Sequence, residues 1–241
     1  MAANTTLADT SLGLPPGSGP EAPPMPIFTG DPNAFNGAGF TAASGVAIAL
    51  SVIAVGLRFW ARAYIMRIVA LEDWLILASL ACAVGVVAML GPMYAHGYGK
   101  HIFTLTKDQL SELFKYSIVV SVLYIFSLTF TKLSILCLYL RVLAYDYVHT
   151  AAKILLGIVL ITHTYIIITM LTACIPLSAY WDMDKRPTAY CHGMPVYWSH
   201  AGLNIVTDFL IFLLPLTVLH KIRSPRPQKI ALAIILLLAF A

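Results

Sequence analysis

The 241-residue chain carries too little charge to coat a water-facing surface, with 59 % hydrophobic and only 11 % charged residues, whereas soluble domains have about 25 % charged residues. Its mean hydropathy is +0.83, and its net charge of +4 comes without any basic run interleaved with aromatics that would favour nucleic-acid binding. The composition therefore indicates an integral membrane protein with the lipid bilayer as its solvent.

Residues 1–39 are rich in Pro, Gly, Ala and Thr. Such a stretch buries too little apolar surface to fold, so we predict a disordered extracellular tail. It lacks the basic segment and short apolar core of a cleaved signal peptide. The triplet Asn4-Thr5-Thr6 is the only N-x-[ST] sequence in the chain and predicts N-glycosylation at Asn4. Residues 40–241 are expected to form one transmembrane helical domain.

Five apolar runs follow the tail, each long enough to cross a hydrocarbon core of about 30 Å as a helix. They are Phe40–Leu57, Trp74–Ala95, Tyr116–Leu140, Ile154–Ile175 and Tyr197–Leu219. A sixth run, Ile230–Ala241, has 12 residues, which would rise only about 18 Å. We expect an incomplete sixth helix; the alternative is a short tail buried among neighbouring helices. The predicted fold class is an all-α, polytopic transmembrane bundle.

The positive charges predict the orientation of these spans, because Lys and Arg near the membrane gather on the cytoplasmic side. Five basic residues lie in the even-numbered loops, and one, Lys132, lies within a span. The odd-numbered loops hold nine: Arg58, Arg62, Arg67, Arg141, Lys153, Lys221, Arg223, Arg226 and Lys229. The bias places the N-terminus outside a multi-pass protein, for which we expect the plasma membrane.

Lys132 and Asp208 are charged residues inside the third and fifth spans. Such residues are costly in a bilayer and normally face a partner, the bundle interior or a water-filled cavity. Both helices start on the same side, and the long Lys132 side chain can reach toward Asp208. We therefore predict an intramembrane ion pair. Three interpretations stay open: the pair borders a ligand site, it only joins two helices, or the two groups are separately satisfied by water and backbone carbonyls.

His163, Asn204 and His200 are the other polar residues expected near this pair. They could line the same cavity, although inter-helix hydrogen bonding alone explains such residues. The histidines show no metal-ligand spacing on one helical face, so we predict no metal site. No phosphate loop, HExxH motif or partnered nucleophile occurs in the sequence, so we predict no catalytic residues and no enzyme activity.

Cys174 and Cys191 fall at and beyond the end of the fourth span, on the predicted outer side. A disulfide there would fold the loop over the outer mouth of the bundle, and the alternative is two free thiols. Cys82 and Cys137 lie inside apolar runs and are expected to be inert. At the start of the second span, Glu72-Asp73-Trp74 fits the helix dipole and the membrane interface.

Thr106 and Gln109 fit a capping box, which predicts that the third helix begins before the membrane. Pro92, Gly97 and Gly99 predict a break ahead of that helix. Pro215 could kink the fifth helix, as proline does in membrane bundles.

Several segments in this order resemble the fungal rhodopsin-domain integral membrane proteins, a seven-helix family that includes G-protein-coupled-receptor-like members. They are LEDWLIL, HGYGKHI, FTKLSILCLYLRV, CIPLSAYW and DFLIFLLPL. The resemblance runs from about Arg58 to Ala241 and implies an outside N-terminus. Positions that match the family pattern are Asp73, Trp74, Gly99, Lys132, Arg141, Cys174, Pro176, Trp181, Cys191, Asp208 and Pro215. The family name is no evidence of retinal, because a Schiff-base lysine would belong to a seventh helix beyond Ala241, and no cofactor is predicted.

The preferred functional hypothesis is a receptor-like protein that senses an extracellular or lipophilic small molecule and passes the signal to a heterotrimeric G protein. The first alternative is a transporter or channel that uses the Lys132–Asp208 pair as a substrate or proton site. The second is a structural, non-signalling membrane protein. An integral membrane enzyme ranks last, for want of a catalytic constellation.

Overall fold

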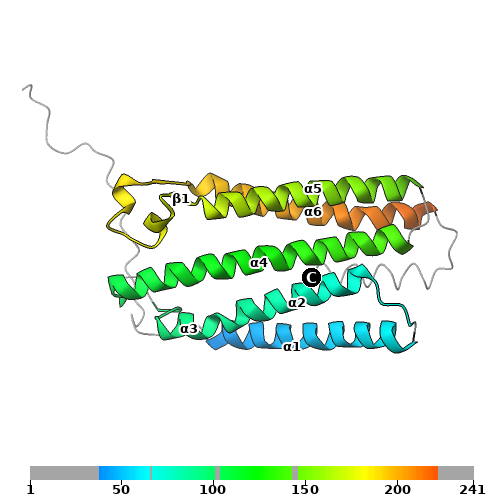
Figure 1. Cartoon of the computed structure of the whole chain (residues 1–241), viewed down its shortest axis with the longest axis horizontal. Helices are drawn as coiled ribbons and strands as arrows, with labels where there is room; N and C mark the ends of the chain where they lie inside the picture. Colours follow the sequence, from blue (N-terminus) through cyan, green and yellow to red (C-terminus); the bar gives the residue numbers. More distant parts are fainter. Residues whose placement is uncertain (1–37, 66, 101–103, 143–145, 222–241) are drawn as a thin grey trace, which may run out of the picture.

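The computed structural model describes residues 38–65, 67–100, 104–142 and 146–221. Long helices lie side by side in one elongated bundle (Figure 1). The helices are α1 Ala38–Trp60 with its π-helical extension η1 Ala61–Ile65, α2 Leu71–Ala88, α3 Leu90–Ala95, α4 Lys107–Val142, α5 Asp146–Leu171 and α6 Met194–Lys221.

Five helical segments among the described residues are long and apolar enough to cross a membrane. They are Gly39–Ile65, Leu71–Ala95, Lys107–Arg141, Asp146–Leu171 and Met194–Pro215. These segments correspond one to one with the five predicted spans, so the all-α transmembrane class is confirmed. The predicted sixth run, residues 1–37 of the predicted tail and the glycosylation triplet at Asn4 lie outside the described residues, whereas Ala38 and Gly39 already belong to α1.

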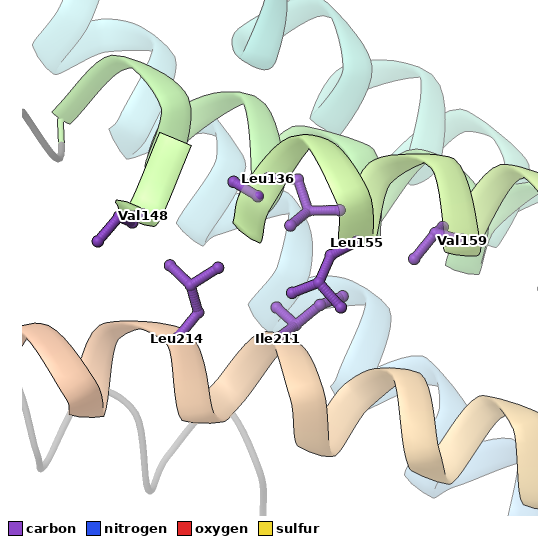
Figure 2. Close-up of a cluster of buried hydrophobic side chains, with 7 residues drawn as sticks. Leu136, Val148, Leu155, Val159, Ile211 and Leu214 are labelled. Carbon is purple, nitrogen blue, oxygen red and sulfur yellow. The ribbon is translucent and has the colours of Figure 1, made fainter. Parts of the chain in front are cut away.

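The helices pack in the order α1, α2, α4, α5 and α6, with the most extensive contact between α2 and α4. Their outward side chains are large and apolar; Leu50, Ile161 and Ile205 are each more than 60 % exposed. Such a surface suits lipid, where a helix satisfies its own backbone hydrogen bonds. The innermost apolar cluster joins α4, α5 and α6 (Figure 2) and consists of Leu136, Val148, Ala152, Leu155, Val159, Ile211 and Leu214.

Three helices are clearly longer than their hydrophobic runs. Helix α1 with η1 continues to Ile65, so Arg58 and Arg62 belong to a helix and not to the predicted first loop. Helix α4 begins at Lys107, because Thr106 and Gln109 form the predicted capping box: the Gln109 amide donates to Thr106 Oγ1 at 3.3 Å and the Thr106 amide to Gln109 Oε1 at 3.1 Å. Helix α5 begins at Asp146 rather than near Ile154. Lys153 therefore belongs to a helix and not to the predicted loop. Hydropathy marks the part of a helix within lipid, not the polar turns that continue beyond it.

A short antiparallel hairpin follows α5, formed by β1 Cys174–Ile175 and β2 Tyr190–Cys191. Cys174 lies opposite Cys191 and forms a disulfide with it, which confirms that prediction. The segment between the strands contains the 3-10 helices η3 Leu177–Tyr180 and η4 Arg186–Thr188. It contacts the start of α4, where the rings of Tyr180 and Phe114 lie 5.6 Å apart. We call this end of the bundle the hairpin end (Figure 1).

Candidate functional site

Lys132 extends from α4 to α6, where it contacts the side chains of Asn204, Thr207 and Asp208 on one face of the helix. Its Nζ donates to Thr207 Oγ1 at 2.7 Å, to Asn204 Oδ1 at 3.0 Å and to the Asn204 carbonyl at 3.3 Å. It lies 3.2 Å from Asp208 Oδ1 in the ion pair that the sequence suggests. Positions 204, 207 and 208 meet at one lysine because residues three and four apart share a helix face.

The two members of this pair differ sharply in burial. The Lys132 side chain is 4 % exposed and the Asp208 side chain 50 % exposed. The ammonium is therefore enclosed by protein acceptors, which offset the cost of a charge within the membrane. The carboxylate keeps a face on which further hydrogen-bond donors can approach.

A cavity of about 440 Å³ lies beside this pair, between α4, α5 and α6 and in the half of the bundle nearer the hairpin end. Its walls are mostly apolar, with a few polar groups from α4 and α6. The lining residues are Ser121, Tyr124, Ile125, Leu128, Ile166, Met170, His200, Ala201, Asn204, Ile205 and Asp208. An apolar pocket with a few convergent polar groups is the arrangement that small-molecule sites usually have.

The two predicted histidines occupy different positions relative to the cavity. His200 lines it, and its Nε2 lies 2.7 Å from Thr169 Oγ1 of α5. His163 does not line it; its Nδ1 lies 2.9 Å from the Val159 carbonyl, and its buried Nε2 has no hydrogen-bond partner among the described residues. The structure thus brings Asn204, His200 and Asp208 to the wall of one cavity. Lys132 contacts Asn204 and Asp208 without lining the cavity, and His163 does not line it either.

A second cluster of charges lies at the opposite end of the bundle, and we call it the arginine network: Arg58, Arg62, Glu72, Asp73 and Arg141. Asp73 is fully buried. Its carboxylate accepts from Arg58 Nε and Arg62 Nη1, both at 3.2 Å, and from the Ala70 amide at 3.1 Å. Glu72 accepts from Arg62 Nη1 at 2.6 Å and from Arg141 Nη1 at 2.9 Å. The network therefore joins α1, α2 and α4.

The sequence reading missed this network. Glu72 and Asp73 seemed explained by the dipole of their own helix, and the Asp73–Ala70 bond is such a local cap. Their arginine partners, however, lie between 10 and 69 residues away along the chain. The available signal was that two adjacent acids and three arginines all fall at the same predicted membrane face.

The remaining family-pattern residues occupy helix ends and turns. Trp74 packs edge-on against Phe59 at 6.2 Å, and Gly99 has a positive φ of 90° in the break before α4. Pro176 precedes η3, and Trp181 follows it. Pro215 is buried within α6, which continues to Lys221. Within the described ranges, no three His, Cys, Asp or Glu side chains are grouped to hold a metal ion.

A family model described as the fungal rhodopsin domain matches residues 57–241. The chain is 27 % identical over 197 residues to the polyenoic acids biosynthesis gene cluster protein Ba17b of Metarhizium anisopliae, covering 79 % of this chain and 52 % of that protein. It is 26 % identical over 185 residues to Receptor GIN3 of Arthrobotrys oligospora, covering 76 % and 44 %. A SAT4 family membrane protein of Emericella nidulans is 26 % identical over 143 residues, covering 58 % and 37 %. The chain thus spans about half the length, or less, of these curated relatives. No solved structure shows significant similarity.

Proposed function

We propose a receptor-like role for this chain, which belongs to the fungal rhodopsin domain family and is a multi-pass membrane protein. In this proposal it lies in the plasma membrane with its hairpin end outside and responds to a small lipophilic molecule. Three findings support it: the family match, a relative that bears the name receptor, and a cavity in the hairpin half of the bundle.

The cavity beside the Lys132–Asp208 pair is the observation that carries the proposal. A half-exposed carboxylate in a membrane helix has a high cost in contact with lipid tails. A ligand that binds Asp208 would remove that cost, and the apolar wall of Ile125, Leu128 and Ile205 would receive its lipophilic part. The hairpin, closed by its disulfide, lies at the same end of the bundle.

Helix α4 offers a direct mechanical link from the cavity to the arginine network. Lys132 contacts α6, whereas two nearby residues of the same helix contact α2: Ser134 Oγ donates to the Glu72 carbonyl at 2.7 Å, and Arg141 binds the Glu72 carboxylate. Lys132 and Arg141 are separated by roughly 13 Å along the helix. A ligand that favours one position of α4 against α6 would also bias the Arg141–Glu72 contact. We propose that a heterotrimeric G protein responds at the arginine-network end.

The proposal is tested by the thermal stability of the chain in lipid nanodiscs against a panel of amphiphilic small molecules. A ligand at 100 times its dissociation constant stabilises its target by about 2.7 kcal/mol. We expect at least one compound to raise the melting temperature, and Ala201→Phe, which adds bulk to the cavity wall, to abolish that shift. Glu112→Gln, a change at an exposed ion pair with Lys115, is the matched control and should keep it.

Reconstitution of the chain in sealed lipid vesicles distinguishes a receptor from a transporter. A receptor binds the stabilising compound and increases nucleotide exchange on an added G protein, without moving the compound across the bilayer. Accumulation of the compound inside sealed vesicles, with no effect on nucleotide exchange, would instead identify a transporter. If every compound left the melting temperature unchanged, the cavity would have no support as a ligand site.

A further inference from the structure

Resting on the proposed ligand cavity, we infer that the head group of the ligand is a hydrogen-bond donor that binds Asp208, and not an anion that binds Lys132. The sequence alone favours neither choice, because it places both charges within the membrane. The geometry of the pair separates them. One charge is enclosed by the protein, and the other lines the cavity.

Lys132 has no donor left for a ligand. An ammonium group carries three N–H bonds, and four protein acceptors surround it: Thr207 Oγ1, two oxygens of Asn204, and Asp208 Oδ1. Its side chain is 4 % exposed, and it does not line the cavity. A ligand anion would have to displace helix α6 from this lysine before reaching it.

Asp208 has capacity to spare. A carboxylate can accept about four hydrogen bonds, and the only ion pair of Asp208 among the described residues is the one to Lys132. Asp208 lines the cavity with half of its side chain exposed. A bound cation or hydroxyl would therefore meet an acceptor that is already ordered by its partner, which limits the entropy lost on binding.

The other lining residues agree with a donor head and an apolar tail. No Lys or Arg lines the cavity within the described part of the chain, so an anionic head would face the Asp208 carboxylate without a counter-charge. The titratable His200 is engaged by Thr169 of the neighbouring helix. Beyond Asp208 and Asn204 the wall is mainly aliphatic. The ligand class is thus an amphiphile with a protonated amine or a hydroxyl as its head.

Photo-crosslinking of the full 241-residue chain in phosphatidylcholine nanodiscs tests this inference. Three probes share a ten-carbon tail with a terminal diazirine and differ only in their head: a primary amine, an alcohol or a carboxylate. Crosslinks at the cavity residues of α4 and α6 are counted by mass spectrometry against those at Leu50, a lipid-facing reference on α1 that is 63 % exposed. We expect the amine and alcohol probes to label the cavity about tenfold more than the carboxylate probe, a ratio equivalent to about 1.4 kcal/mol.

Variants then assign the preference to Asp208. Asp208→Asn should reduce amine labelling about tenfold and alcohol labelling less, because an amide still accepts a hydrogen bond. Asp208→Glu keeps the carboxylate and should keep the order of the probes, so it serves if the asparagine variant fails to fold. Asp184→Asn, an exposed carboxylate change in the hairpin segment, should have no effect.

Three contrary results have different meanings. If the carboxylate probe labels the cavity as well as the amine probe does, the inferred head group is wrong while the cavity remains a ligand site. If no probe labels the cavity above the Leu50 reference, the ligand cavity of the proposed function fails, and this inference fails with it. If the amine preference survives in Asp208→Asn, the head group binds elsewhere.

Discussion

Three carboxylates within the membrane-spanning helices have two different environments. Asp73 and Glu72 are almost completely enclosed, and each binds two arginines. Asp208 binds one lysine and keeps half of its side chain exposed. A saturated carboxylate joins helices, whereas an unsaturated one can also accept a ligand. This contrast is consistent with a structural role for the arginine network and with the ligand-binding role proposed for the cavity.

Loss of the Asp73 charge should destabilise the bundle. Asp73→Asn leaves Arg58 without its buried counter-charge and leaves Arg62 with Glu72 alone. We expect a loss of about 2 kcal/mol in the free energy of unfolding, since hydrogen bonds to charged groups contribute about that much. Glu112→Gln, in an exposed pair with Lys115, should cost much less, because exposed ion pairs contribute little to stability. Unfolding in mixed detergent micelles measures both, and equal losses would contradict the structural role of the network.

The Lys132–Asp208 pair should show measurable coupling. Lys132→Met and Asp208→Asn each leave one partner without its counter-charge, while the double variant removes both charges. We therefore expect the double variant to be more stable than the sum of the single losses predicts, with a coupling energy of about 1 kcal/mol. A double-mutant cycle of unfolding free energies measures this term. Strictly additive losses would mean that the two groups are satisfied independently.

The sequence predicts the Lys132–Asp208 pair but not the arginine network. Charges inside apolar spans are conspicuous, and the depth of Lys132 and Asp208 in their helices brings them within reach of each other. The arginine network lies at the membrane face, where charges are expected anyway. The tendency of arginine to gather on the cytoplasmic side of a membrane is enough to explain the arginines of that face. Only the fold shows that Arg58, Arg62 and Arg141 converge on the same pair of acids.

Among the elements, the break between α3 and α4 depends on backbone geometry that glycine allows. Gly97 has φ of 95°, a conformation that other residues adopt with strain. A Cβ at this position would also collide with the Leu105 side chain. This turn follows α3, and α4 begins later at its own capping box.

Gly97→Ala should therefore destabilise the chain by about 1 kcal/mol or more. Gly157, within α5, has no neighbour within 4 Å of an added Cβ, and Gly157→Ala should be neutral or stabilising by up to about 1 kcal/mol. The two substitutions add the same methyl group, so their melting temperatures in one detergent form a matched comparison. A similar shift for both would show that the positive φ at Gly97 is not required.

The helices themselves follow from the sequence, but their ends follow only where a local capping signal marks them. All five spans were expected because apolar runs of this length have few other uses. The capping box of Thr106 marks the start of α4 correctly, since a cap is a local signal. The first turns of α5 carry Asp146 and Lys153, and hydropathy cannot distinguish such polar helical turns from a loop.

For the whole molecule, the two ends of the bundle differ in the chemical groups that they carry. The hairpin end carries the disulfide and the half of the bundle that holds the cavity. The other end carries the arginine network, and the odd-numbered loops near it hold most of the basic residues. The proposed receptor needs the hairpin end outside, where a disulfide is stable, and the basic end in the cytosol.

Labelling of single cysteines in intact cells tests this orientation most directly. In a background without Cys82 and Cys137, Asp184→Cys lies in the hairpin segment at a side chain that is 80 % exposed. Arg67→Cys lies at the exposed turn between α1 and α2. A membrane-impermeant maleimide should label Asp184→Cys in intact cells and Arg67→Cys only after permeabilisation. The reverse pattern would place the cavity half toward the cytosol and contradict a receptor for an external signal.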